Sequence, residues 1–224
     1  MRFFYHTTAC WLLLLAIAGP GLCQAGADAS DRTKGQIVEK LESRYHGAAI
    51  QAEFVQKSTL VAMDITDTAT GKAWFKHPGM MRWEYETPDA HAIISDGDTL
   101  WIHRPADNQV IVGNALAYFG NGKGASFLSN IGLVKEAFSV EKTAARQDGH
   151  YTLKLTPLEK ELDLSEIYLN IDKKTFSIDS VITRNAYGDQ TRIEFRNIRF
   201  RDSIPDSKFK FEIPGSADVM QMSK

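Results

Sequence analysis

The sequence predicts a mainly β (α+β) protein with about ten or eleven short strands in one antiparallel sheet, curled into a barrel or half-barrel. Three observations lead to this prediction. Apolar and polar residues alternate with a period of two over much of the chain, turn-forming clusters separate these stretches at short intervals, and few segments have helical spacing. No internal repeat or Pro/Gly/Ser-rich linker divides the 224 residues, so we expect a single domain.

The N-terminal residues 1–27 have the pattern of a signal peptide. A positively charged start is followed by an apolar run over residues 9–18 and by small residues that allow cleavage after Ala25 or Ala27. The apolar run is shorter than the roughly 20 residues that span a bilayer, and no later segment approaches that length. The sequence therefore predicts a soluble exported protein made of residues 28–224.

The cysteines and the net charge exclude several classes of protein. Cys10 and Cys23 both lie in the predicted signal peptide, so the exported chain would have no disulfide, Cys-ligated metal or cysteine nucleophile. Lipidation of Cys23 is disfavoured because Leu22, rather than a small residue, precedes it. The formal charge of −2 gives no general attraction for nucleic acid, so we expect no nucleic-acid partner.

The first predicted element after the signal peptide is an amphipathic helix of about 15 residues. Ser30-Asp31 supply N-cap candidates, and Gly47 follows the expected end of the helix. Between them Ile37, Leu41 and Tyr45 recur at a spacing of four, which places them on one apolar face.

Strand-like alternation follows this helix and resumes after a central interruption. Residues 114–132 lack alternation, although 125–131 can form a short helix that presents Phe127, Leu128 and Ile131. Asp96-Gly97-Asp98 is a hairpin-type turn between two of the strands. The predicted strands are 50–56, 71–75, 81–87, 91–95, 99–104, 109–113, 138–142, 151–156, 166–172, 176–184 and 191–200.

Motifs of catalysis and metal binding are not found in the sequence. There is no G-x-S-x-G elbow, and the glycine-rich residues 120–124 lack phosphate-loop spacing. The acidic pairs Glu84/Glu86 and Asp96/Asp98 suit a solvated strand face and a turn. We therefore expect no enzymatic activity, no cofactor and no metal. The histidines that remain after export form no close metal-binding pair; they are His46, His77, His91, His103 and His150.

Large apolar side chains are concentrated within 28 residues, on neighbouring predicted strands. An aromatic sheet face must be covered by a helix, closed on itself or filled by a ligand. The composition alone leaves two interpretations open, an ordinary core and an apolar cavity. The residues concerned are Trp74, Met81, Trp83, Tyr85 and Trp101.

Four motifs in order make the sequence more specific. They are F-x-Q-K at 54–57, G-K-A-W-F-K-H-P-G at 71–79, R-W-E-Y-x-x-P at 82–88 and S-D-G-x-x-L-W at 95–101. The segment 198–214 adds a matching C-terminal pattern. With these motifs the chain resembles the periplasmic outer-membrane lipoprotein carrier family, LolA.

This resemblance implies a fold and a function. The fold would be an unclosed antiparallel half-barrel with short helices as a lid over an apolar cavity. The protein would be a monomeric, non-enzymatic carrier in the periplasm that accepts the acyl chains of lipoproteins. An inner-membrane Lol-type ABC transporter would supply the lipoprotein, and the outer-membrane receptor LolB would take it. The alternative is a LolA-like binding protein for another lipid or glycolipid, either a specialised carrier or an RseB-type sensor.

The resemblance also assigns roles to individual residues. Phe127, Leu128 and Ile131 would belong to the lid. His77 stands where family members often have an arginine that holds the lid closed, so His77 is the candidate latch, with Lys76 or Arg82 as substitutes. The acyl-chain cavity would be lined by Phe54, Trp74, Met81, Trp83, Tyr85 and Trp101.

Overall fold

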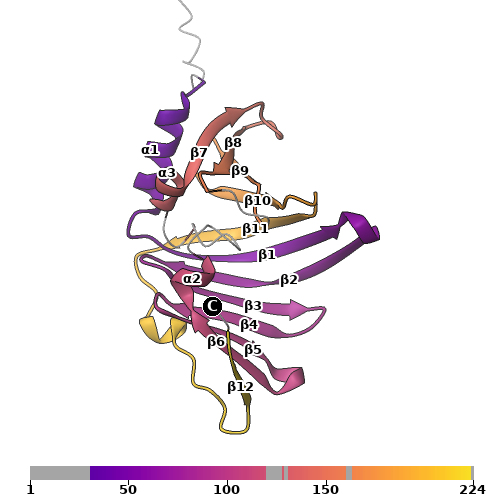
Figure 1. Ribbon diagram of the computed structural model, residues 1–224. Helices are drawn as coiled ribbons and strands as arrows, with labels where there is room; N and C mark the ends of the chain where they lie inside the picture. Colours follow the sequence, from indigo (N-terminus) through magenta and orange to yellow (C-terminus); the bar gives the residue numbers. More distant parts are fainter. Residues whose placement is uncertain (1–30, 120–127, 129–130, 160–162, 223–224) are drawn as a thin grey trace, which may run out of the picture. The chain divides into compact units, whose positions relative to one another are not determined.

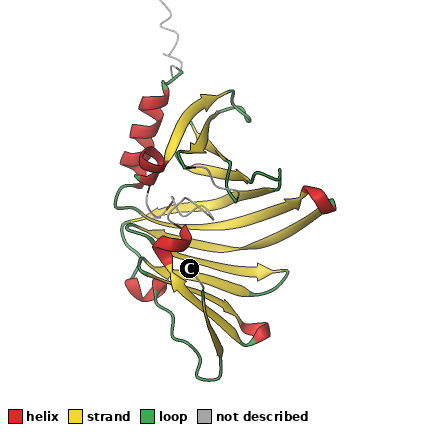
Figure 2. Cartoon of the chain, in the orientation of Figure 1, coloured by secondary structure: helices red, strands yellow, loops and turns green. Residues whose placement is uncertain are grey.

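The computed structural model describes residues 31–119, 128, 131–159 and 163–222. Contacts divide the chain into a unit of residues 1–31 and a unit of residues 32–224. The second unit contains every element described here, and Figures 1 and 2 show a broad curved sheet with short helices along it.

Twelve strands form this one sheet, in the order β12-β6-β5-β4-β3-β2-β1-β11-β10-β9-β8-β7. The helices are α1 (Lys34–Tyr45), α2 (Ala115–Phe119) and α3 (Leu133–Ala137). The strands are β1 (Ala49–Leu60), β2 (Ile65–Lys76), β3 (Met80–Thr87), β4 (His91–Asp96), β5 (Thr99–Arg104), β6 (Gln109–Asn114), β7 (Phe138–Thr143), β8 (His150–Pro157), β9 (Glu166–Asp172), β10 (Ile178–Arg184), β11 (Gln190–Arg201) and β12 (Asp218–Gln221).

The sheet is unclosed, as predicted. Its two end strands, β12 and β7, are not hydrogen-bonded neighbours of each other, and all adjacent strands are antiparallel except β12 and β6. The parallel strand β12 was not predicted and raises the count to twelve. It reaches β6 by a long connection rather than by a hairpin, and all four of its residues are exposed, so neither a turn signal nor a buried face marks it.

The helix α1 starts later than Ser30-Asp31. Thr33 is the N-cap, and a capping box joins it to Gln36: the Thr33 amide donates to Gln36 Oε1 at 2.9 Å, and the Gln36 amide donates to Thr33 Oγ1 at 3.4 Å. The helix therefore has 12 residues instead of about 15. Its apolar face is as predicted, with Ile37, Leu41 and Tyr45 buried against the sheet.

The central region contains two short helices that the sequence did not predict. Asn114 caps α2, because its Oδ1 accepts a hydrogen bond from the Ala117 amide at 2.8 Å. Most of the helix predicted over 125–131 lies outside the described residues; Leu128 and Ile131 lie within them. No helix within the described ranges combines the length and apolar composition needed to cross a bilayer.

Several strand boundaries also differ from the prediction: β1 and β2 extend to Leu60 and back to Ile65 around their turn, and β10 starts later than predicted. Phe176 has a φ of 54° and lies in a turn, and β10 begins at Ile178. The carboxylate of Asp172 stabilises this turn by accepting hydrogen bonds from the amides of Lys174 and Thr175 at 2.9 and 2.7 Å.

Candidate functional site

The inner face of the sheet is built around β3. Met81, Trp83 and Tyr85 alternate with Arg82 and Glu84, so the three large side chains point to one face. The register pairs Met81 with Phe75 and Trp83 with Ala73 of β2, which extends the same face across two strands. Met81 and Trp83 are only 1% and 3% exposed and belong to the main hydrophobic core.

Aromatic rings meet edge-to-face on this surface. The ring centroid of Phe54 on β1 lies 4.9 Å from those of both Trp83 and Tyr85. Phe75 and Phe195 continue the group, at 5.3 and 6.0 Å from Trp83. These two phenylalanines were not among the predicted site residues. Phe75 could have been found from its alternation with Trp74, whereas Phe195 needed the pairing of β1 with β11.

A glycine allows this close packing. A Cβ at Gly71 would overlap the backbone carbonyl of Glu84 and press on the ring of Phe54. The β2–β3 register shifts between Thr70 and Gly71, so the backbone bends toward β3 at this point. Gly71 therefore leaves room for the ring of Phe54, its partner on β1.

Tyr85 gives the aromatic surface one polar group. Its hydroxyl donates to Gln56 Oε1 at 3.0 Å, and burial, with a smaller effect from Tyr118, raises its pKa to about 12. The hydroxyl thus remains protonated and paired near neutral pH. Since Tyr118 belongs to α2, this short helix lies near the Tyr85 end of the inner face.

Trp74 and Trp101 lie on the opposite face of the sheet, so the prediction that they share a face with Trp83 is wrong. Trp74 is paired with Arg82, and its side chain packs with Ala49, Ile204 and Phe209 in a separate small cluster. Trp101 is paired with Ile94, the neighbour of Arg82, and its ring lies 6.5 Å from that of Phe211. The C-terminal segment covers this outer face, so Trp74 is buried there and Trp101 is half-buried.

Helix α1, helix α3 and the segment that carries Leu128 and Ile131 cover part of the inner face, and together they are called the cover. Tyr45 packs edge-to-face on Phe200 at 5.3 Å, and its hydroxyl accepts the Ile178 amide at 2.8 Å. Lys135 of α3 forms a 2.6 Å ion pair with Glu42 of α1, which joins two covering elements.

Two of the predicted lid residues are buried in the core beneath this cover. Leu128 and Ile131 are 6% and 8% exposed, whereas Phe127 lies outside the described residues. Below Leu128 is a cavity of about 10 Å³ between α1, the sheet and this segment. It is lined by Tyr45, Ile50, Ala52, Phe75, Leu128, Ile178, Phe195 and Ile198.

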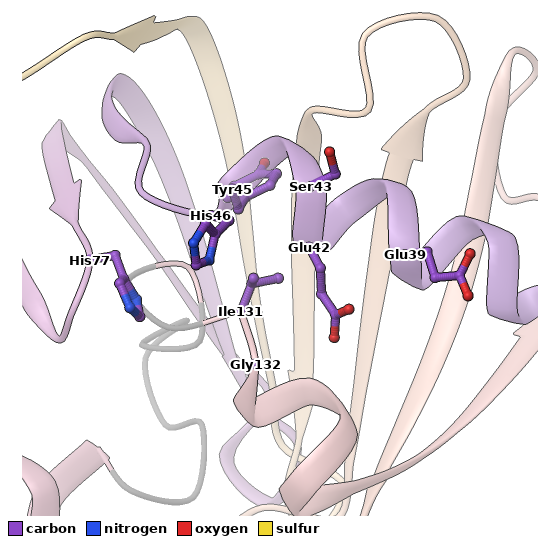
Figure 3. Close-up of a pocket in the computed structure, with 8 residues that line it drawn as sticks. All are labelled: Glu39, Glu42, Ser43, Tyr45, His46, His77, Ile131 and Gly132. Atoms are coloured by element: carbon purple, nitrogen blue, oxygen red, sulfur yellow. The ribbon is translucent and has the colours of Figure 1, made fainter.

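His77 lies at the edge of the covered region. It lines a surface pocket of about 580 Å³ together with residues of α1 and the segment that precedes α3. Its ring centroid is 6.0 Å from that of His46, which follows α1, and Figure 3 shows both rings beside Ile131. His77 is therefore close to the cover, and its role as a latch stays a prediction.

Lys76 and Arg82 are engaged on the outer face instead. Lys76 Nζ donates to the carbonyl of Ile204 at 3.0 Å and pairs with Asp206. Arg82 donates to the carbonyl of Lys208 at 3.2 Å. Both cations hold the C-terminal segment against the sheet, so neither can replace His77 at the cover.

One acidic and histidine-containing cluster was not predicted. The ligand atoms of His150, Asp172 and Asp179 lie within 4.8 Å of one another. His150 Nδ1 faces the Asp148 carbonyl at 3.0 Å and Nε2 faces Asp179 Oδ2 at 2.9 Å; both partners are acceptors, so this geometry favours the imidazolium. Burial opposes that charge, but these hydrogen bonds outweigh it and raise the pKa of His150. His150 and Asp179 therefore form an ion pair within the fold whenever the imidazole is protonated.

Comparison with known proteins agrees with this architecture. Outer-membrane lipoprotein carrier proteins of Cupriavidus pinatubonensis and Methylibium petroleiphilum are each 29% identical to the chain, over 187 and 214 residues. The first alignment covers 82% of this chain and 86% of the relative, the second 94% and 96%. An uncharacterized conserved protein of Thermus thermophilus shares the fold, with a TM-score of 0.54 over 85% of this chain and 100% of that chain at 10% identity. Residues 46–212 match the family described as outer membrane lipoprotein carrier protein LolA, and the chain therefore belongs to this family.

Proposed function

We propose that this protein binds the acyl chains of lipoproteins on the inner face of its sheet and carries them across the periplasm. The observation that carries the proposal is the aromatic inner face, where Phe54, Trp83 and Tyr85 pack edge-to-face next to Met81. Such a face, with Leu128 and Ile131 buried against it from the covering segment, offers apolar surface to a lipid once the cover moves.

The mechanism relies on burial of apolar surface and needs no chemical step. Each methylene that leaves water contributes about 0.8 kcal/mol, so complete burial of several acyl chains would make release far too slow for a carrier. A carrier therefore buries its cargo only in part. When the cover closes, Leu128 and Ile131 return to the inner face and compete with the acyl chains, and cargo passes to a receptor that buries it better.

His77 is proposed as the latch between the sheet and the cover. Its position beside His46 and Ile131 supports this role. A neutral histidine has a single donor, whereas an arginine has five and a permanent charge, so His77 would hold the cover less firmly than an arginine would.

The location and the partners follow from the same proposal. Residues 1–27 would direct export and be removed, leaving residues 28–224 in the periplasm. An inner-membrane Lol-type ABC transporter would load the carrier, and the outer-membrane receptor LolB would unload it. The carrier would work as a monomer without a cofactor.

Identification of the bound lipid tests the proposal directly. The protein would be purified from the periplasmic fraction, and its intact mass and bound molecules would be measured by mass spectrometry. Lipoproteins bound through their acyl chains are the expected result. Recovery of only a glycolipid or another lipid would instead support a specialised carrier, and a diacylglyceryl adduct on Cys23 would contradict a soluble carrier.

Two neighbouring residues provide a matched test of the binding face. Ile102 packs against the main core on the inner face, whereas Trp101 points to the outer face, and both are half-buried. Ile102→Glu should weaken binding of a fluorescent fatty acid by about tenfold or more, because an unpaired carboxylate would face the acyl chain. Trp101→Glu should leave the affinity within about twofold. Equal losses in two variants that remain folded by circular dichroism would contradict the assignment of the inner face.

A further inference from the structure

The turn between β1 and β2 carries a cluster of exposed apolar side chains. Val61 and Met63 are 56% and 62% exposed, and the flanking Leu60 and Ile65 are 37% and 43% exposed. The six residues 58–63 contain no charged residue. Figure 1 shows that the β1–β2 hairpin projects past the turns of the strands beside it, so these side chains lie at a protruding end.

A second turn is fastened to this one and adds an aromatic residue. The Val61 amide donates to Asp189 Oδ1 at 2.9 Å, and the side-chain amide of Asn185 donates to Asp189 Oδ2 at 2.9 Å. Tyr187, which lies between Asn185 and Asp189, is 69% exposed. We define the apolar tip as Leu60, Val61, Met63, Ile65 and Tyr187.

The tip has the size and shape of a lipid contact rather than of a stable protein interface. Five side chains with these exposures present on the order of 400 Å² of apolar surface, about half of what one partner buries in a stable protein complex. A protein partner would also need a pocket that fits a convex end, whereas a bilayer adapts to it. Tyrosine suits the boundary between headgroups and acyl chains, because its ring is apolar and its hydroxyl remains hydrated.

The charges around the tip favour a neutral membrane surface. Lys57 on β1 is paired with Arg192 on β11, and the exposed Asp64 and Asp67 follow on the other side of the turn. Because these two cations and two carboxylates balance, the tip has no net electrostatic attraction for anionic lipids.

We propose that the apolar tip inserts into the interface of a zwitterionic phospholipid bilayer. The exposed apolar side chains, the hydrogen bond that joins the two turns and the charges around them support this proposal. Shallow insertion of a few side chains is reversible, so it brings the protein to a membrane without anchoring it there. This contact is separate from the inner face and does not depend on what that face binds.

Vesicle flotation tests the proposal with protein purified from the periplasmic fraction and vesicles of phosphatidylethanolamine and phosphatidylcholine. Wild type should float with the vesicles. Met63→Glu and Val61→Glu should lower the vesicle-bound fraction about tenfold, because each places a charge in the apolar layer. Leu158→Glu is the matched control: Leu158 is also 62% exposed but lies beside α3, where its amide donates to the Ala137 carbonyl, and its substitution should have no effect.

Three results would overturn the proposal. In the first, wild type fails to float with zwitterionic vesicles or binds only when anionic lipid is added. In the second, Leu158→Glu lowers binding as much as Met63→Glu. In the third, sedimentation shows a dimer that Met63→Glu abolishes, which would assign the tip to contact with a second copy. The fluorescent fatty acid should bind Met63→Glu and wild type equally, so loss of vesicle binding is distinguished from loss of the inner-face site.

Discussion

The hydroxyl of Tyr45 holds the end of α1 against the sheet, and Tyr45→Phe removes this single contact. The substitution keeps the ring and its packing on Phe200, but the Ile178 amide loses the acceptor that lies 2.8 Å away. Tyr45 and Ile178 are 5% and 1% exposed, so water does not replace the hydroxyl readily.

The magnitude follows from the cost of an unpaired buried donor. That cost is about 1–3 kcal/mol in the free energy of unfolding. For a domain of this size each kcal/mol lowers Tm by about 2–4 °C, so we expect a decrease of about 2–12 °C. Because α1 covers part of the inner face, loosening its end should also increase the binding of an apolar dye.

Urea unfolding and thermal scans measure the stability, and amide exchange at Ile178 measures the contact itself. The matched control is Tyr187→Phe, which removes a hydroxyl from a residue that is 69% exposed and should change stability by less than about 0.5 kcal/mol. If Tyr45→Phe behaved like this control and the Ile178 amide exchanged no faster, the hydroxyl would not be the contact that holds α1.

Three further substitutions have defined outcomes. Gly71→Ala should destabilise the protein by about 1–3 kcal/mol in urea unfolding, because its Cβ overlaps the Glu84 carbonyl. His150→Gln should lower Tm at pH 6 and much less at pH 9: since folding raises the pKa of His150, its stabilising effect is complete below the unfolded pKa of about 6.5 and is lost as pH rises through the folded value. His77→Arg should reduce apolar-dye binding severalfold in fluorescence titrations, because five donors and a permanent charge would hold the cover more firmly.

Each of these substitutions has a control or a contradicting outcome. Gly35→Ala, where a Cβ meets no atom within 4 Å, should stabilise α1 by about 0.5–1 kcal/mol, and equal behaviour of the two alanine variants would refute the steric argument. A pH-independent loss of stability in His150→Gln would show that its ion pair is unimportant. His103→Arg introduces the same charge near Phe211 on the outer face, so a similar fall in dye binding there would reject the latch.

The sequence by itself determined the strand pattern, the helical face of α1 and the family motifs. Alternation within β3 placed Met81, Trp83 and Tyr85 on one face because successive strand residues point to opposite sides. The spacing of Ile37, Leu41 and Tyr45 predicted the buried face of α1 for the same kind of local reason. The prediction of a family from ordered motifs also needed no knowledge of contacts.

Only the tertiary structure decided which strand faces are combined. Local alternation gives each strand two faces, but the pairing register determines that Phe75, and not Trp74, shares the face of Trp83. Trp101 was misassigned for the same reason, because its burial depends on a segment more than a hundred residues later in the chain. The joining of the two turns at the apolar tip likewise depends on the Val61–Asp189 contact, which the sequence pattern cannot reveal because it unites residues 128 positions apart.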